Sequence, residues 1–251
     1  MAASPLVGAL LLLFSWRVSA RVARWATLCA LGLAALGTLV LLPWAGHVLP
    51  AGIEWLPGTG PMGIALGATS VYAAGVTTWS ALLAVLATGR PAAGASPLSC
   101  VLTLFAVAGA NVAFLSGHFL GRYVALEIVA LSVALAPLVE MRSSDGSHLS
   151  TACYLVLRLG DAGLLFGILI LWSAGNTLDI ASALEAGKAL DAGRLGWAVA
   201  GLVLATWAKV GAWPLHVWQQ ASQSLALDTR SWLYATVVPN LGLYLLYRVI
   251  P

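Results

Sequence analysis

Glu127, Arg158, Asp161 and Lys209 are charged residues that lie within apolar runs of this sequence. A charged side chain inside a membrane span costs at least about 2.5–3.5 kcal/mol on insertion scales. Such a residue therefore pairs with an opposite charge, lines a water-filled cavity, or does both. A carboxylate and a lysine that face each other can also exchange a proton at little net cost. The sequence thus predicts a central titratable pair, Glu127 with Lys209, that moves protons or cations.

Arg158 and Asp161 are three residues apart, so on a helix they lie at neighbouring positions of one face. One interpretation is that this pair modulates the Glu127–Lys209 pair. The other is a self-neutralising pair with a structural role only. Purely structural roles also stay open for Glu127 and Lys209, although small residues and hydroxyls suffice for helix pairing in membranes.

Pro214 follows Lys209 closely and removes one backbone hydrogen bond. Broken helices are tolerated at membrane depth where they line a cavity, so a broken helix is expected around residues 213–218. A simple helix end at the interface is the alternative. His118 and His216 lie at the edges of apolar runs, where they serve either as proton relays or as interfacial polar residues.

The composition supports a membrane setting for these charges. The chain has 251 residues, of which 61% are hydrophobic and 8% are charged. Soluble domains carry about 25% charged residues. We therefore expect an all-α polytopic membrane protein with a single transmembrane domain, residues 1–251. About eight spans are expected, at residues 5–16, 26–44, 62–87, 98–115, 119–138, 151–172, 195–212 and 232–250.

Two segments between these spans have their own character. Residues 45–61 hold prolines and tryptophans and are expected to lie at the membrane interface. Residues 177–194 are expected to form a short amphipathic helix on the surface. Arginines gather in the loops after the first, third and fifth expected spans, which places the amino terminus on the outer face. The expected location is a bacterial inner membrane.

Other classes of function find little support in the sequence. The net charge of +3 is small and its basic residues are scattered, so no nucleic-acid partner is expected. The cysteines Cys29, Cys100 and Cys153 have neither disulfide nor metal spacing. The sequence has no nucleotide-binding fingerprint, phosphate loop or nucleophile triad. We therefore expect no metal, no cofactor and no catalytic residue in this chain.

Three motifs resemble the antiporter-like subunits of respiratory complex I and of Mrp-type sodium/proton antiporters, in particular subunit L. The motifs are HFLGRYVALEIVALS (118–132), LRLGDAG (157–163) and AKVGAWPLHVW (208–218). The resemblance matches Glu127 and Lys209 to the family's glutamate and lysine. It implies a proton-translocating, non-redox membrane subunit of an NADH-quinone oxidoreductase-like or other proton-coupled complex.

The chain also departs from that family. Tyr234 stands where the family has a histidine or lysine, and only the amino-terminal half of the family is matched. A second antiporter-like half and other membrane subunits are therefore expected partners. One alternative is an energising subunit for inorganic-carbon uptake, which works with a soluble zinc protein. Another is a degenerate subunit that kept the fold and lost the pump.

Overall fold

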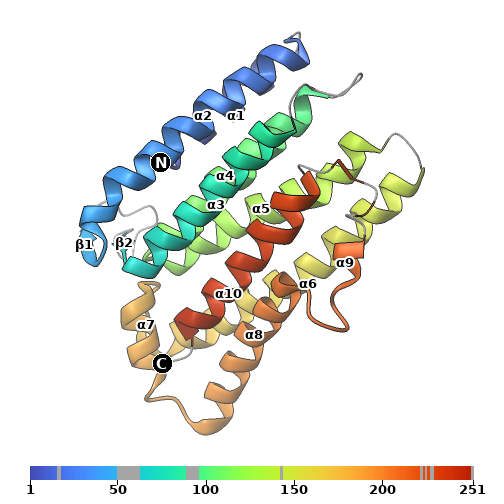
Figure 1. Cartoon of the computed structure of the whole chain (residues 1–251). Helices are drawn as coiled ribbons and strands as arrows, with labels where there is room; N and C mark the ends of the chain where they lie inside the picture. Colours follow the sequence, from blue (N-terminus) through green and yellow to red (C-terminus); the bar gives the residue numbers. More distant parts are fainter. Residues whose placement is uncertain are drawn as a thin grey trace.

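The computed structural model describes residues 1–15, 18–49, 63–88, 96–141, 144–220, 223, 225–226 and 229–249. These residues form a bundle of helices with one small two-stranded sheet (Figure 1). Its α-helices are α1 (Ala3–Phe14), α2 (Ala20–Leu41), α3 (Ala68–Ala87), α4 (Pro97–Leu115), α5 (Phe119–Glu140), α6 (Ser144–Gly175), α7 (Ile180–Gly187), α8 (Ala192–Val210), α9 (Val217–Gln220) and α10 (Val238–Val249). The 3-10 helix η1 (Leu42–Trp44), the π-helix η3 (Thr229–Val237) and the strands β1 (His47–Leu49) and β2 (Ile64–Leu66) complete the described elements.

The chain is an integral, multi-pass membrane protein with an all-α fold. Five helices of the described part are long and apolar enough to cross a membrane, and they span Ala20–Trp44, Ala68–Ala87, Pro97–Leu115, Phe119–Glu140 and Asp145–Gly175. The expected number of eight spans is not confirmed. The first expected span is a helix of 12 residues, and the last is divided between η3, with 9 residues, and α10, with 12.

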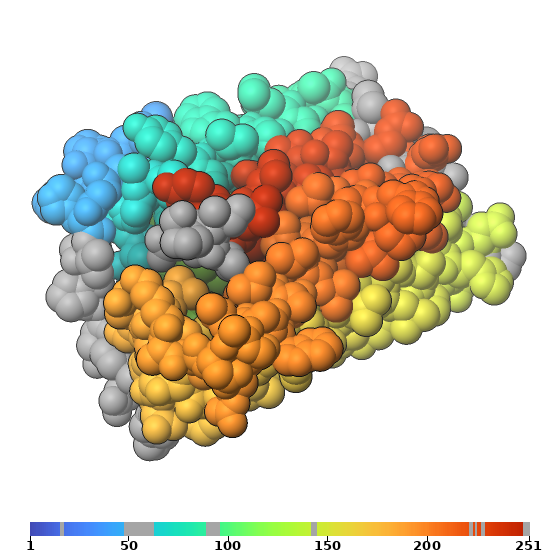
Figure 2. Space-filling model, turned by 90° about the horizontal axis from the view of Figure 1, so that it is seen from below, coloured from blue at the N-terminus to red at the C-terminus, as the bar shows by residue number. Residues whose placement is uncertain are grey.

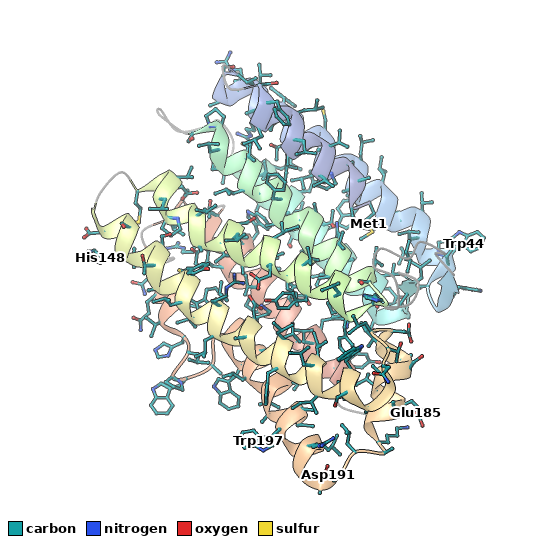
Figure 3. All side chains as sticks on the ribbon, turned by 180° about the vertical axis from the view of Figure 1, so that it is seen from behind. Met1, Trp44, His148, Glu185, Asp191 and Trp197 are labelled. Atoms are coloured by element: carbon teal, nitrogen blue, oxygen red, sulfur yellow. The ribbon has the colours of Figure 1, made fainter. Side chains whose placement is uncertain are left out.

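Helix α6 is longer than the sequence suggested, because it begins within the polar stretch before residue 151 and has 32 residues. At a rise of about 1.5 Å per residue, a helix of this size is about 48 Å long. The hydrocarbon core of a bilayer is only about 30 Å thick. The ends of α6 therefore extend beyond the apolar layer. Figure 3 shows His148 near one end of α6, with Glu185 and Asp191 near the opposite end of the bundle.

The segments that were expected to lie outside the spans are only partly described. Residues 50–62, most of the expected interfacial loop 45–61, lie outside the described residues. Within 177–194 the structure has the short helix α7, followed by the first residues of α8. Residues 17, 90 and 142, which carry part of the orientation argument, are also outside the described part.

The loops at one end of the bundle are joined by β-type hydrogen bonds. Strands β1 and β2 pair in an antiparallel arrangement, and Ile64 forms a bridge with Ser116. His118 forms a second bridge with Asp179, just before α7. Loops far apart in the sequence thus meet at the same end of the bundle.

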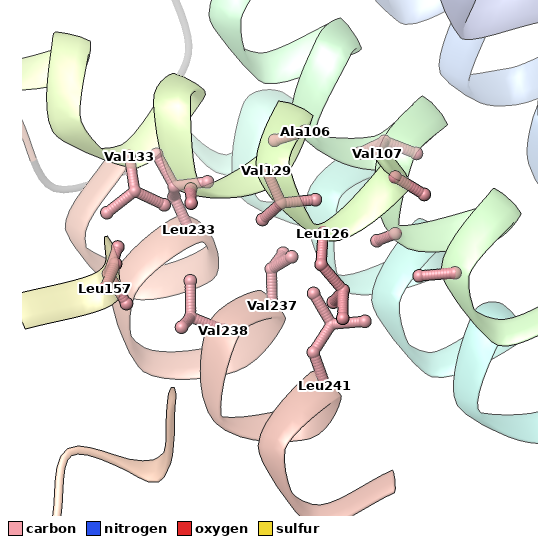
Figure 4. Packing of buried hydrophobic residues seen from close by; sticks show 14 of the residues in the cluster. Ala106, Val107, Leu126, Val129, Val133, Leu157, Leu233, Val237, Val238 and Leu241 are labelled. Atoms are coloured by element: carbon pink, nitrogen blue, oxygen red, sulfur yellow. The ribbon is translucent and has the colours of Figure 1, made fainter. Parts of the chain in front are cut away.

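The buried apolar core extends through most helices of the bundle, and Figure 4 shows the part of it where α5 meets η3 and α10. Leu126, Val129 and Val133 follow one face of α5, at the spacing of three to four residues that a helix requires. They face Val237 and other apolar residues of η3 and α10, all of them buried. Figure 2 shows, on the face seen from below, α8 (orange) between α6 (yellow) and α10 (red). Helix α8 is therefore packed on both sides by helices.

Candidate functional site

The close approach of α6 and α8 positions two of the charged residues. Gly160 and Gly163 on α6 face α8, and Gly201 on α8 faces α6. A Cβ atom added to Gly201 would lie 2.5 Å from the backbone oxygen of Gly163, and one added to Gly160 would lie 2.6 Å from Ala208 Cβ. Small residues allow helix backbones to approach closely in membranes. Side chains of α6 and α8 that lie near these glycines can therefore contact each other directly.

Lys209 on α8 and Asp161 on α6 form a buried ion pair in this contact. The ammonium Nζ of Lys209 donates a hydrogen bond of 2.5 Å to Asp161 Oδ1. The two side chains are only 3% and 1% exposed. Helix α10 covers the pair, because a Cβ atom on its Gly242 would lie 3.1 Å from Lys209 Cβ. The Oδ2 atom of Asp161 is buried and has no hydrogen-bond partner among the described residues.

Glu127 on α5 forms an ion pair with Arg158 on α6. This second pair is less shielded, since the Arg158 side chain is 46% exposed and that of Glu127 is 17% exposed. The guanidinium of Arg158 also lies over the ring of Tyr154, with 5.6 Å between its carbon and the ring centroid. A partly exposed guanidinium thus neutralises the carboxylate of α5.

These contacts correct the expected pairing of the four charges. The sequence suggested Glu127 with Lys209 and Arg158 with Asp161, whereas the structure joins Glu127 to Arg158 and Asp161 to Lys209. Two residues three positions apart on a helix differ in direction by about 60°. On α6 this difference directs Arg158 towards α5 and Asp161 towards α8.

Helix α8 ends one residue after Lys209, before Pro214. Gly211 adopts φ +70° and closes the helix, and its amide and that of Ala212 donate to the carbonyls of Ala208 and Trp207. This arrangement is typical of helix C-termini. The Trp213–Pro214 peptide is cis, and the short α9 follows. The helix break expected at 213–218 thus corresponds to an interruption from Gly211 to His216, which begins at a glycine.

Two side chains of α9 return to the carbonyl end of α8. The indole Nε1 of Trp218 donates to Ala208 O at 2.9 Å, and Gln219 Nε2 donates to Val210 O at 3.1 Å. Both carbonyls lie in the last turn of α8, where the regular amide donors of a following helical turn are missing; Ala208 O also accepts from the Gly211 amide. The segment after Pro214 therefore folds back and supports the helix end that carries Lys209.

The two histidines occupy different places. His118 is 2% exposed and lies at the end of the bundle where the loops are joined by β bridges. His216 is partly buried between α8 and α9, and its Nδ1 atom has no hydrogen-bond partner among the described residues. Tyr234 is buried, its hydroxyl donates to Val133 O at 2.9 Å, and its ring centroid lies 5.6 Å from that of Trp218.

Arg122 was not among the predicted site residues, yet it is a buried charge, only 3% exposed. Its Nε donates to Ala113 O at 3.1 Å and its Nη2 to Ser116 O at 2.7 Å, at the carbonyl end of α4. The guanidinium carbon also lies 5.2 Å from the ring centroid of Tyr244. A positive charge at a helix C-terminus is favourable. The sequence feature that could have indicated Arg122 is its position in the same apolar run as Glu127.

In the part of the chain that the structure describes, no three or more His, Cys, Asp or Glu side chains are grouped to hold a metal ion.

Comparison with known proteins places this architecture in a family. Residues 116–251, more than half of the chain, match the family described as NADH:quinone oxidoreductase/Mrp antiporter, transmembrane. The chain belongs to this family. It is 30% identical over 253 residues to NADH-quinone oxidoreductase subunit N of Deinococcus radiodurans, a match that covers 94% of this chain and 50% of that protein. Subunit N of Neisseria gonorrhoeae is 36% identical over 121 residues, 47% of this chain and 25% of that protein.

These comparisons support the family rather than the particular subunit. Both relatives are named subunit N, so the sequence-based choice of subunit L is not confirmed. This family member spans half the length of the Deinococcus relative.

Solved structures show the same fold. The Mrp complex from Dietzia sp. DQ12-45-1b has a chain with a TM-score of 0.83 and 21% identity, covering 99% of this chain and 47% of that one. Respiratory complex I from Thermus thermophilus has a chain with a TM-score of 0.77 and 21% identity, and the match covers 99% of this chain and 52% of that one. At these identities the likeness concerns the fold alone.

Proposed function

We propose that this chain is a proton- or cation-translocating membrane subunit of a multi-subunit complex, and that Glu127, Arg158, Asp161 and Lys209 form its translocation site. The observation that carries the proposal is the pair of ion pairs that share helix α6. One of them is almost fully buried, the other is partly exposed, and their α6 members are three residues apart.

The buried pair is suited to proton exchange because both of its states are electrically neutral. When Lys209 gives its proton to Asp161, an ammonium and a carboxylate become an amine and a carboxylic acid. The net charge of the site stays at zero, so no unpaired charge is left in the apolar interior. An arginine keeps its charge under all ordinary conditions. Arg158 is therefore a fixed charge near Asp161.

The two ion pairs are coupled through that fixed charge. Protonation of Glu127 would remove its attraction for Arg158 and leave the guanidinium free to act on Asp161. The guanidinium would then compete with Lys209 for the Asp161 carboxylate, so protonation of Glu127 would change the contacts of the buried pair. His118 and His216 are the proposed relays at the edges of this system.

The partners are proposed from the family. The compared structures are a Mrp complex, an archaeal membrane-bound sulfane sulfur reductase and a respiratory complex I, all named as complexes. Because the compared structures are multi-subunit complexes, we propose other membrane subunits as partners, among them a second antiporter-like half, in a bacterial inner membrane. A soluble zinc protein for inorganic-carbon uptake is the alternative partner. Mass spectrometry of the complex purified from native membranes distinguishes the two.

The direct test compares the two lysines of the chain, Lys188 and Lys209. Lys188 is an exposed partner of Glu185, with a side chain that is 69% exposed. We expect Lys209→Met and Glu127→Gln to abolish coupled transport in inverted membrane vesicles while the complex stays assembled. Lys188→Met should transport normally. Full transport by both site variants would overturn the proposal.

A structural subunit without transport is a second candidate, and Tyr234 favours it. The family resemblance places a basic residue there, whereas the Tyr234 hydroxyl donates to the carbonyl oxygen of Val133. In that case the site variants would reduce the amount of assembled complex, or change nothing. Assembly and transport must therefore be measured on the same membranes.

A further inference from the structure

A groove with several polar side chains in its lining lies between α9 and η3. Its volume is about 490 Å³. Figure 1 shows α9 next to the upper part of the red helix formed by η3 and α10. The groove is lined by His216, Gln219, Gln220, Gln223, Arg230, Tyr234, Ala235 and Pro239. This volume is within the range of about 300–1,000 Å³ that small-molecule sites occupy.

The groove extends from the level of Lys209 towards one end of the bundle. On one side, Gln219 donates to the carbonyl of Val210, the residue after Lys209. On the other, Arg230 belongs to the first turn of η3, whose start is held by Glu140 at the end of α5. The Glu140 carboxylate accepts hydrogen bonds from Ala226 N, at 2.8 Å, and from the hydroxyl of Thr229. The groove therefore opens close to the membrane boundary at the Glu140 end.

The side chains that line the groove favour an anion. They include one guanidinium, one imidazole and three carboxamides, and no carboxylate is among the lining residues that the structure describes. Such groups are costly against lipid tails, so the groove must hold water or a polar ligand. The planar fork of an arginine matches phosphate oxygens with two parallel hydrogen bonds. The imidazole of His216, which also lines the groove, adds a second hydrogen-bonding group.

We propose that this groove binds a phosphate-type anion, with Arg230 as the charged contact and His216 and the glutamine amides as neutral hydrogen-bonding groups. The anion is either the phosphate of a lipid headgroup or a free phosphate from the aqueous phase. Basic pockets between membrane helices are suited to anionic headgroups. This binding does not depend on the proposed translocation, so it is measurable on a protein that transports nothing.

The test uses the purified full chain in nanodiscs, with Arg194→Gln as the matched control. Arg194 is 68% exposed and forms an ion pair with Asp191 at the start of α8, away from the groove. Native mass spectrometry counts retained phosphatidylglycerol in mixed phosphatidylglycerol and phosphatidylcholine discs. In discs of phosphatidylcholine alone, ³¹P line broadening measures the binding of inorganic phosphate.

We expect Arg230→Gln to weaken binding roughly tenfold or more, the amount lost with one charge-assisted hydrogen bond. Arg194→Gln should bind as the unmodified chain does. Loss of retained phosphatidylglycerol identifies a lipid site, whereas loss of phosphate broadening identifies a site for the free anion. Absence of both signals in the unmodified chain would overturn the proposal, and so would equal binding by the two arginine variants.

A second variant keeps the test decisive if Arg230→Gln does not fold. Gln220→Glu places a negative charge at an exposed position of the groove, and Ala181→Glu places the same charge on exposed α7. Like charges repel, so only Gln220→Glu should lose the anion. Unchanged binding by a folded Gln220→Glu protein would contradict the proposal.

Discussion

The ammonium nitrogen of Lys209 lies 2.5 Å from Asp161 Oδ1, between two helices whose glycines bring the backbones together. Arg158, three residues before Asp161 on α6, is paired with Glu127 of α5 instead. Helix α6 thus connects a buried ion pair on one side with a partly exposed one on the other. Arg158 and Asp161, one from each ion pair, are therefore separated by less than one turn of α6.

Removal of one member of the buried pair should cost far more stability than removal of both. Lys209→Met leaves the Asp161 carboxylate buried without its counter-ion, which typically costs about 3–5 kcal/mol. In the double variant Lys209→Met, Asp161→Asn no charge remains unpaired, and much of that loss should be recovered. The free energy of unfolding of the purified protein in detergent measures this. A single variant as stable as Lys188→Met would show that the ion pair is not formed.

The sequence located the four charges but not their pairing. It identified Glu127, Arg158, Asp161 and Lys209, because charges inside apolar runs are conspicuous. Pairing depends on which helix each residue of α6 faces and on how closely α8 approaches, and both depend on packing at glycines such as Gly201. Neither quantity has a local signature in the sequence.

The fold was predictable to a similar extent. Apolar length placed the starts of α4 and α5 within one residue, at Pro97 and Phe119. It did not indicate that the last expected span is part π-helix and part α-helix, divided at Val238. Trp232 and Tyr234 of the π-helix are buried as they would be in an α-helix, and a hydropathy pattern looks the same in both kinds of helix.

The glycine contact between α6 and α8 should be sensitive to one added methyl group. In Gly201→Ala the new Cβ would lie 2.5 Å from the backbone oxygen of Gly163, so the helices must separate. Such overpacking costs about 1–3 kcal/mol. Gly196, on the same helix, has no neighbouring atom within 4 Å of an added Cβ. Gly196→Ala should therefore stabilise the protein by up to about 1 kcal/mol.

Thermal unfolding of the two alanine variants, measured side by side, tests this contact. Equal stability of Gly201→Ala and Gly196→Ala would mean that α6 and α8 lie farther apart than described. Because the Lys209–Asp161 distance depends on the same contact, Gly201→Ala should also reduce transport.

The hydroxyl of Tyr234 should contribute to stability and not to proton transfer. It donates to the carbonyl oxygen of Val133 inside the core. Tyr234→Phe leaves that carbonyl without the donor and should cost about 1 kcal/mol. Tyr72→Phe, at a side chain that is 60% exposed, should leave stability unchanged. Transport by Tyr234→Phe should match that of the unmodified protein. A variant that keeps its stability but stops transporting would instead place this hydroxyl on the proton path.

The length of α6 predicts that its two ends lie on opposite faces of the membrane. Ser147 is exposed in the first turns of α6, and Ser182 is exposed on α7, just past its far end. With Cys29, Cys100 and Cys153 replaced by alanine, a cysteine is introduced at either serine. If the amino terminus is outside, Ser182→Cys should react with a membrane-impermeant maleimide in intact cells. Ser147→Cys should react only in inverted vesicles.

The remaining labelling patterns are also informative. A helix about 48 Å long that crosses a layer about 30 Å thick has its two ends on opposite sides, and both ends lie on one side only if the helix lies flat on the membrane. Labelling of both cysteines from the same side would therefore contradict a spanning α6. Labelling on opposite but exchanged sides would keep the fold and invert the orientation. The groove near Glu140 would then face the outer solution, and an outer-leaflet lipid would become the anion to test there.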